Sequence, residues 1–302
     1  MATNKFNKIV CVDDCGLTGN YKSKIYDLSE TVIEYNNVPE NNVEIMSRIG
    51  DADCVLVSWK TRIDAHVLSK CPGIKYIGMC CSLYDEKSAN VDIIKANELG
   101  IVVKGVKDYG DQGTLEFIFA QLIKLYSEII PKQWNVEPTE IGSKTLGILG
   151  MGILGQMVAR MGLNFGMKVV YYNRSRKEEI EHLGINYFPL KEMLPQCDIV
   201  SIHLPRNANV LDAAAFKLLK EPSVLVQTSL GVPFDTDAFM EWVKNKHNYV
   251  VFDGAQNVGL FGEYAKDNPN ILITSRSSGF TKEAKKRLTE KVWLNMLNFL
   301  EN

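Results

Sequence analysis

The chain has 302 residues, of which 46% are hydrophobic and 23% are charged. This composition is ordinary for a globular protein, and the length suffices for about two domains. The formal net charge of −2 gives no electrostatic reason to expect binding to nucleic acid or to an anionic membrane. The opening residues, MATNKFNK, lack the apolar segment of a signal peptide, and no apolar run approaches the length of a membrane span.

The cysteines and histidines indicate a reduced, metal-free protein. Seven cysteines without paired CxxC spacing favour free thiols in a cytoplasmic protein. The adjacent Cys80 and Cys81 are better explained by buried packing than by a disulfide or a metal site. The four histidines are scattered along the chain and do not have the spacing of metal ligands.

The first hundred residues alternate β-rich and helical segments, which predicts a small doubly wound parallel sheet. Gly100 has the position of a helix C-cap, and a long helix should end at Pro131, because proline cannot continue it. A linker is expected over residues 134–142. The predicted strands are 8–12, 31–35, 54–58, 75–79 and 101–104, and the predicted helices are 42–49, 64–69, 91–99 and 112–130.

The same alternation continues through the second half of the chain and predicts a second α/β unit. A last amphipathic helix begins at Thr281, which has the residue type of an N-cap. The predicted strands are 146–149, 168–172, 199–202, 224–227, 249–253 and 271–274, and the predicted helices are 153–166, 178–183, 213–219, 236–246 and 281–300.

A glycine-rich turn follows the strand at 146–149 and opens the helix after it. The turn reads Gly150-Met151-Gly152-Ile153-Leu154-Gly155, and strand, turn, helix and strand are the context that a dinucleotide fingerprint requires. Gly150 permits the tight turn, Gly152 lets backbone N–H groups approach a pyrophosphate, and Gly155 lets the helix pack closely. The pyrophosphate would lie at the helix N-terminus. The alternative is a glycine-rich turn that binds no ligand.

The end of the strand at 168–172 bears on which dinucleotide binds. An acidic residue at this point would bind the ribose hydroxyls of NAD, but the sequence here is Asn173-Arg174-Ser175-Arg176. No carboxylate repels a 2′-phosphate, and two guanidinium groups can pair with one. We therefore predict NADP, with NAD as the alternative cofactor. The opposing interpretation is that both arginines only cap a strand end in solvent.

The whole chain resembles the D-isomer-specific 2-hydroxyacid dehydrogenases. The resemblance is carried by TLGILGMGILGQMVA, DIVSIHLP, LVQTSLG, VVFDGA, the crossing segment VKGVKDYGDQGTLEF and a Thr-x-Glu-Ala helix start. It implies an α/β fold of two doubly wound domains, in which a Rossmann domain (105–279) is inserted in a flavodoxin-like substrate domain (1–104 and 280–302). It also implies a substrate cleft between the domains and a homodimer.

The resemblance assigns further positions to the cofactor. Asp253 matches the aspartate that binds the nicotinamide carboxamide, although a strand-end cap is the alternative. Thr228, Ser229 and Leu230 would line the nicotinamide pocket. The loop His203-Leu204-Pro205 matches one that passes along the cofactor, and a lone histidine after a strand is more often structural than catalytic.

Three catalytic positions of the family have changed. Leu230 replaces the arginine that binds the substrate carboxylate, and Thr274-Ser275-Arg276 replaces a stretch that ends in the acid/base histidine. Val258 aligns with the glutamate that orients this histidine, and its neighbours Gln256 and Asn257 do not titrate. Losing a general acid/base costs about 10²- to 10⁴-fold in rate.

Other side chains offer partial replacements. Arg276 could stabilise an oxyanion or bind an anionic substrate. Tyr109, Lys104 and Lys60 lie on segments that the family uses to wall the cleft, and a desolvated tyrosine or lysine could donate a proton. For each of these three, a solvated surface role is the simpler interpretation.

Two functions remain open at this point, and a standard 2-hydroxyacid dehydrogenase is a third, least favoured interpretation. One is an NADPH-dependent reductase of a carbonyl or imine compound that is not a standard 2-oxo acid. The other is a catalytically silent homologue that binds a dinucleotide and acts as a sensor or partner protein. The polar Gln256-Asn257 and the cationic Arg276 favour the reductase, because a decayed site would be filled with apolar residues.

Overall fold

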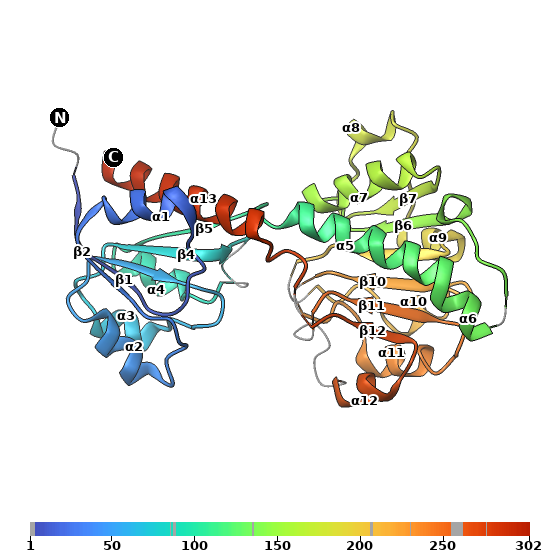
Figure 1. The fold of residues 1–302 in the computed structure, drawn as a ribbon, viewed down its shortest axis with the longest axis horizontal. Helices are drawn as coiled ribbons and strands as arrows, with labels where there is room; N and C mark the ends of the chain where they lie inside the picture. Colours follow the sequence, from blue (N-terminus) through green and yellow to red (C-terminus); the bar gives the residue numbers. More distant parts are fainter. Residues whose placement is uncertain are drawn as a thin grey trace. The chain divides into compact units, whose positions relative to one another are not determined.

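The computed structural model describes residues 4–84, 86, 89–134, 136–205, 208–229, 231–254, 262–275 and 277–302. The chain forms two compact units (Figure 1). The first contains Met1–Tyr109 and Thr281–Asn302, and the second contains Gly110–Phe280. The boundary therefore follows Tyr109, five residues beyond the boundary expected from the sequence.

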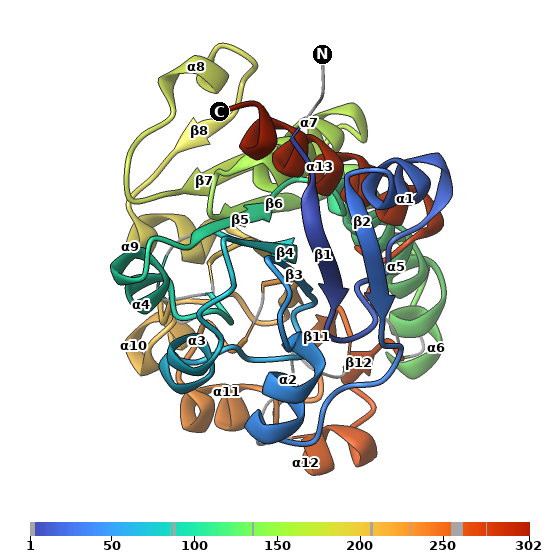
Figure 2. The ribbon, with the colours of Figure 1, turned by 90° about the vertical axis from the view of Figure 1, so that its left-hand side faces the viewer.

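The first unit is a parallel sheet of five strands in the order β2-β1-β3-β4-β5. Helices α2, α3 and α4 cover one face, and α1 and α13 cover the other (Figure 2). The strands are β1 Phe6–Cys11, β2 Ser29–Glu34, β3 Cys54–Val57, β4 Tyr76–Ser82 and β5 Val102–Val106. The helices are α1 Gly19–Tyr26, α2 Asn42–Ile49, α3 Ala65–Lys70, α4 Ile93–Glu98 and α13 Lys282–Glu301.

Capping residues fix the ends of these helices. The side chains of Asn41, Asp64, Asp92 and Thr281 each accept a hydrogen bond from a backbone N–H in the first turn of the helix that follows. Gly100 follows α4 with φ +71°, which confirms its C-cap role. Helix α1 was not predicted, because its sequence GNYKSKIY is polar and only Ile25 is buried.

The second unit is a parallel sheet of seven strands in the order β12-β11-β10-β9-β6-β7-β8. Its strands are β6 Thr145–Leu149, β7 Lys168–Tyr172, β8 Asn186–Tyr187, β9 Ile199–Ile202, β10 Val224–Gln227, β11 Tyr249–Phe252 and β12 Ile271–Ile273. Its α-helices are α5 Asp111–Lys124, α6 Ile130–Trp134, α7 Ile153–Asn164, α8 Glu178–Glu181, α9 Leu190–Met193, α10 Ala213–Phe216, α11 Thr236–Trp242 and α12 Gly262–Asp267. The short elements β8, α9 and α12 were not predicted.

The long helix does not end at Pro131, so this prediction was wrong. A π-helical turn, Leu125–Ile129, joins α5 to α6, and Pro131 is the second residue of α6. The helix continues through Pro131, because the π-helical turn before it changes the hydrogen-bond pattern that proline would otherwise interrupt. The expected linker at 134–142 overlaps the last residue of α6 and the start of a 3₁₀ turn, Ile141–Ser143, which precedes β6.

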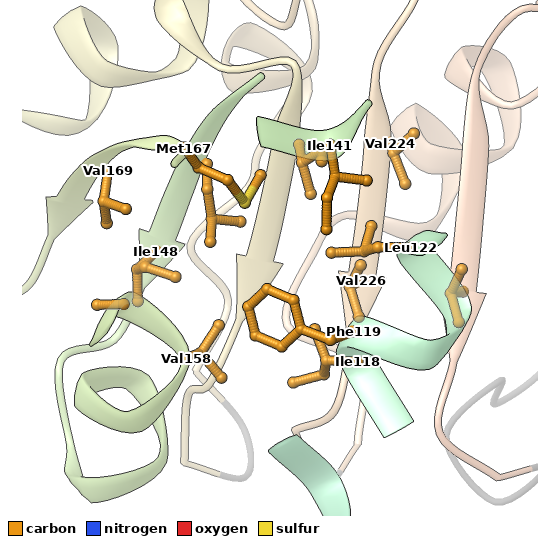
Figure 3. Packing of buried hydrophobic residues seen from close by; sticks show 14 of the residues in the cluster. Ile118, Phe119, Leu122, Ile141, Ile148, Val158, Met167, Val169, Val224 and Val226 are labelled. Carbon is orange, nitrogen blue, oxygen red and sulfur yellow. The ribbon is translucent and has the colours of Figure 1, made fainter. Parts of the chain in front are cut away.

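The core of the second unit consists of two hydrophobic clusters. Figure 3 shows Ile118, Phe119 and Leu122 of α5 packed with Val158 of α7 against side chains of the sheet such as Ile148. A second cluster fills the opposite face beneath α9, α10 and α11. Because every strand pair is parallel, the loops that leave β6, β7, β9, β10 and β11 all emerge at the carboxyl edge.

Candidate cofactor site

The carboxyl edge of the second sheet carries most of the predicted cofactor residues. The chain proceeds from β6 to β7 and β8 on one side, then to β9 on the other side of β6. The point between β6 and β9 is therefore a topological switch point, where ligands of such sheets bind. His203 N–H donates to the carbonyl oxygen of Leu149 at 2.8 Å, which joins the two loops at this point.

The three glycines of the turn differ in what a β-carbon at each position would meet. Gly150 has φ +95°, and a β-carbon there would overlap the carbonyl oxygen of His203. A β-carbon on Gly155 would overlap the carbonyl oxygen of Gly150, so α7 approaches the turn closely. No protein atom lies within 4 Å of the corresponding point on Gly152. The second glycine thus faces open space, where a ligand can approach the backbone.

The N-terminus of α7 is free of protein caps in the described part of the chain. Gly152 is the N-cap residue, and no side chain accepts from the first turn. Ile153 is exposed, whereas Met151 is buried and holds the turn in the core. The free N–H groups and the helix dipole favour an anion at this point. A dinucleotide pyrophosphate fits these features.

Asn173 connects the glycine turn to the loop after β7. Its Oδ1 accepts from Met151 N–H at 3.1 Å, and its Nδ2 donates to the carbonyl oxygen of Ser175 at 2.8 Å. The side chain therefore uses both ends of its amide within the protein.

The two arginines beside Asn173 differ. Arg176 forms a two-point pair with Glu181, with Nε–Oε1 at 2.8 Å and Nη2–Oε2 at 2.5 Å. This pair lowers the pKa of Glu181 to about 2, with Arg176 as the main cause. Arg174 is exposed and has no ion-pair partner among the described residues. Two guanidinium groups were expected to bind a phosphate. Among the described residues, only that of Arg174 has no carboxylate partner.

His203 is held as a neutral, structural imidazole. Burial lowers its pKa to about 3. Thr228 Oγ1 donates to the carbonyl oxygen of Ile202 at 3.0 Å, so it accepts from His203 Nδ1 at 2.9 Å. Nε2 then accepts from Ser201 Oγ, also at 2.9 Å. A neutral ring with both nitrogens engaged is unsuited to proton transfer near pH 7.

Gln227 is a site residue that sequence reasoning missed. It is fully buried at the end of β10, and its Oε1 accepts from Ser229 N–H at 3.0 Å. Its Nε2 donates to the carbonyl oxygens of Ser229 at 3.2 Å and Gly231 at 2.6 Å. Ser229 Oγ in turn accepts from Leu204 N–H at 2.7 Å. The signal in the sequence was an amide at the end of an otherwise apolar strand.

Asp253 is 4% exposed and is hydrogen-bonded within the second unit. Its two oxygens accept from Ser278 N–H at 2.7 Å and Ser278 Oγ at 2.8 Å. Burial raises the pKa of Asp253, and the hydrogen bonds from Ser278 oppose this shift. Ser278 Oγ also lies 3.1 Å from Thr114 Oγ1 of α5, so the carboxylate is tied to the beginning of the long helix.

Of the candidate catalytic residues, Tyr109 and Lys104 lie in the first unit, and Arg276 lies outside the described residues. Tyr109 is half-buried against the core of the first unit, and burial raises its pKa to about 12, so it stays protonated near neutral pH. Lys104 is exposed within β5 rather than at its end, and Lys60 is exposed after β3. Outside the described residues lie Arg276, Leu230, Gln256, Asn257 and Val258.

The described residues contain no group of three His, Cys, Asp or Glu side chains that could hold a metal ion. Within the same residues, no helix combines the length and apolarity needed to cross a membrane. Pro205, in the loop after β9, is exposed.

The fold and the glycine turn define a dinucleotide-binding α/β protein. A family model described as the NAD binding domain of the D-isomer specific 2-hydroxyacid dehydrogenases matches residues 118–275, which is more than half of the chain. The chain therefore belongs to this family of nicotinamide-dependent oxidoreductases.

Similar proteins extend beyond the matched domain. A glyoxylate reductase of Aeropyrum pernix is 28% identical over 92% of this chain and 88% of its own length. A hydroxypyruvate reductase of Blautia hydrogenotrophica is 27% identical over 97% of both chains. The solved structure of an acyclic imino acid reductase in complex with NADPH and D-Arg has a TM-score of 0.79, 24% identity and 97% coverage of both chains.

Proposed function

We propose that this protein is an NADPH-dependent reductase of a carbonyl or imine compound. The observation that supports the cofactor is the open space at Gly152 in front of the uncapped α7 N-terminus. Backbone N–H groups of the turn would hold the pyrophosphate. Thr228, Ser229 and Asp253 lie on loops of the same edge and would border the nicotinamide ring. A bound reduced nicotinamide supplies a hydride to the carbon of a C=O or C=N bond.

The proposed unit roles and assembly follow from the family. The first unit would bind the substrate, and two copies of the chain would form a homodimer in the cytoplasm. The fold accommodates NADPH in a protein named as an imino acid reductase, which is compatible with an imine substrate.

The preference for NADPH depends on Arg174. Arg174→Ala is expected to weaken NADPH binding by about ten- to hundredfold, the range of a charge-assisted phosphate contact, without changing NADH binding. Arg176→Ala is the matched control and is expected to have a smaller effect, because Arg176 is paired with Glu181. Calorimetric titration of both variants with both cofactors measures this difference. Equal loss of NADH and NADPH binding in Arg174→Ala would contradict the assignment.

The altered catalytic positions predict poor turnover of small 2-oxo acids. Glyoxylate and hydroxypyruvate, after which two relatives are named, should be reduced about 10²-fold or more slowly than by an enzyme with an acid/base histidine. Arg276→Ala should abolish the activity found on any better substrate, which NADPH oxidation over a panel of carbonyl and imine compounds would identify. Rapid turnover of glyoxylate would overturn the proposal. Tight cofactor binding without any turnover would instead favour the silent dinucleotide-binding protein.

A further inference from the structure

A small cavity lies at the amino edge of the sheet in the second unit. It has a volume of about 170 Å³. Three of the residues that line it directly precede strands: Lys144 before β6, Asp198 before β9 and Ser223 before β10. Because the strands are parallel, they begin at this edge and end at the opposite edge, where the glycine turn and His203 lie. The cavity is therefore separate from the candidate cofactor site.

The carboxylate of Asp198 is compensated within the protein. Its Oδ1 accepts from Lys220 Nζ at 2.9 Å, and its Oδ2 accepts from Thr145 N–H at 2.8 Å. With both oxygens engaged, Asp198 offers little attraction to a ligand in the cavity.

Two other charged side chains that line the cavity, Lys144 and Glu137, are not compensated. Lys144 is half-buried, and its ammonium group lies 5.2 Å from the centre of the Tyr126 ring, which keeps it at the cavity wall. Glu137 is exposed. Across the described residues, neither side chain has an ion-pair partner. One cation and one anion are therefore available to the same ligand.

The hydroxyl group of Ser223 also lacks a partner. Ser223 is 1% exposed, and its Oγ makes no hydrogen bond in the described part of the chain. Buried polar atoms are nearly always hydrogen-bonded, so an exception in the wall of a cavity indicates a position for a ligand. Tyr126, on the opposite part of the lining, belongs to the π-helical turn, a feature that is frequent at functional sites.

The rest of the lining is largely apolar and limits the size of a ligand. Ile130 and Val224 are buried there, and Val136 is 51% exposed. A cavity of roughly 150 Å³ holds benzene, so this cavity has room for about six to eight non-hydrogen atoms.

We propose that this cavity binds a small apolar α-amino acid, such as alanine or valine, as a zwitterion. Lys144 pairs with the carboxylate, Glu137 pairs with the ammonium group, and the apolar side chain of the ligand covers Val136. Only a ligand with charges of both signs satisfies both side chains, which excludes a simple carboxylate, an amine or inorganic phosphate as the best ligand. Binding requires neither a dinucleotide nor turnover, so the proposal is independent of the proposed reductase activity.

Calorimetric titration of the intact protein with related ligands tests the charge pattern. Both enantiomers of valine are compared with isovalerate, which lacks the amine, with isobutylamine, which lacks the carboxylate, and with inorganic phosphate. The better enantiomer of valine should bind with a dissociation constant of about 1 mM or lower, and the other three ligands roughly tenfold more weakly or worse. The proposal is overturned if neither enantiomer binds, or if isovalerate or phosphate binds as tightly as valine.

Exchanging one charge at a time identifies the partner of each ligand group. Lys144→Met should weaken valine binding about tenfold or more and leave isobutylamine binding unchanged, whereas Lys144→Arg should retain most of the affinity. Glu137→Gln should have a smaller effect on valine, because an exposed pair is screened, and none on isovalerate. Lys191→Met and Glu192→Gln, exposed on α9 across the sheet, are the matched controls and should change nothing. Equal losses of valine and isobutylamine affinity in Lys144→Met would contradict the pairing of Lys144 with a carboxylate.

Discussion

Gly155→Ala is expected to destabilise the second unit by about 3 kcal/mol or more, at the upper end of the cost of overpacking. The added methyl group would overlap the carbonyl oxygen of Gly150, and a backbone atom in a tight turn cannot move aside cheaply. Gly152→Ala is the matched control, since its methyl group would enter open space. That variant should fold normally and lose roughly tenfold or more in cofactor affinity, because the methyl group occupies the approach to the helix N-terminus.

Urea unfolding and cofactor titration of the two variants measure this contrast. Two glycines three residues apart would then show separate defects, one in stability and one in binding. If Gly152→Ala bound the cofactor as tightly as the unmodified protein, the pyrophosphate would not lie against this turn. If Gly155→Ala were as stable as the unmodified protein, this result would contradict the close approach of α7 to the carbonyl oxygen of Gly150.

Acidification from pH 7 to pH 4.5 is expected to cost about 2 to 3 kcal/mol of stability through His203 alone. The folded-state pKa of about 3 lies below the ordinary value of 6.5, so the unfolded chain binds the extra proton. Stability from His203 is therefore complete above about pH 6.5 and is lost as the pH falls toward 3. The pair of Glu181 with Arg176 has the same sign, but its loss falls mainly below the ordinary carboxyl pKa of 4.5.

The contribution of His203 is isolated by comparison with His203→Gln, which cannot take up a proton. The free energy of unfolding should decline less steeply between pH 7 and pH 4.5 in this variant. Parallel declines in the two proteins would show that the imidazole is not buried in its neutral form.

The sequence predicts those features that depend on local pattern. Gly150 and Gly155 have the backbone and steric requirements that their spacing indicated, and β7, β9 and β10 have the predicted bounds. Helix α1 could not be predicted, since it is stabilised by packing against α13, which is more than 250 residues away in sequence. The prediction that the long helix ends at Pro131 was wrong, because a π-helical turn before it changes the hydrogen-bond pattern.

The candidate site shows the same division between local and long-range information. Residue type indicated that Arg174 and Arg176 could both meet a phosphate, but only the fold shows that Glu181 already occupies Arg176. Likewise, the two ring nitrogens of His203 are hydrogen-bonded to Ser201 and Thr228, which come from two different strand ends. Such partners are set by tertiary contacts that no window of sequence contains.

Under the proposed use of NADPH, Asn173 would link coenzyme choice to the integrity of the loop at 173–176. Aspartate at this position would still accept from Met151, but it would set a carboxylate oxygen against the carbonyl oxygen of Ser175, which now receives a hydrogen bond. Converting the protein to an NADH user by that single exchange would therefore disturb the loop as well as the recognition. A change of coenzyme preference would therefore require several substitutions within residues 173–176, made together. The same requirement would apply to a change of preference during evolution.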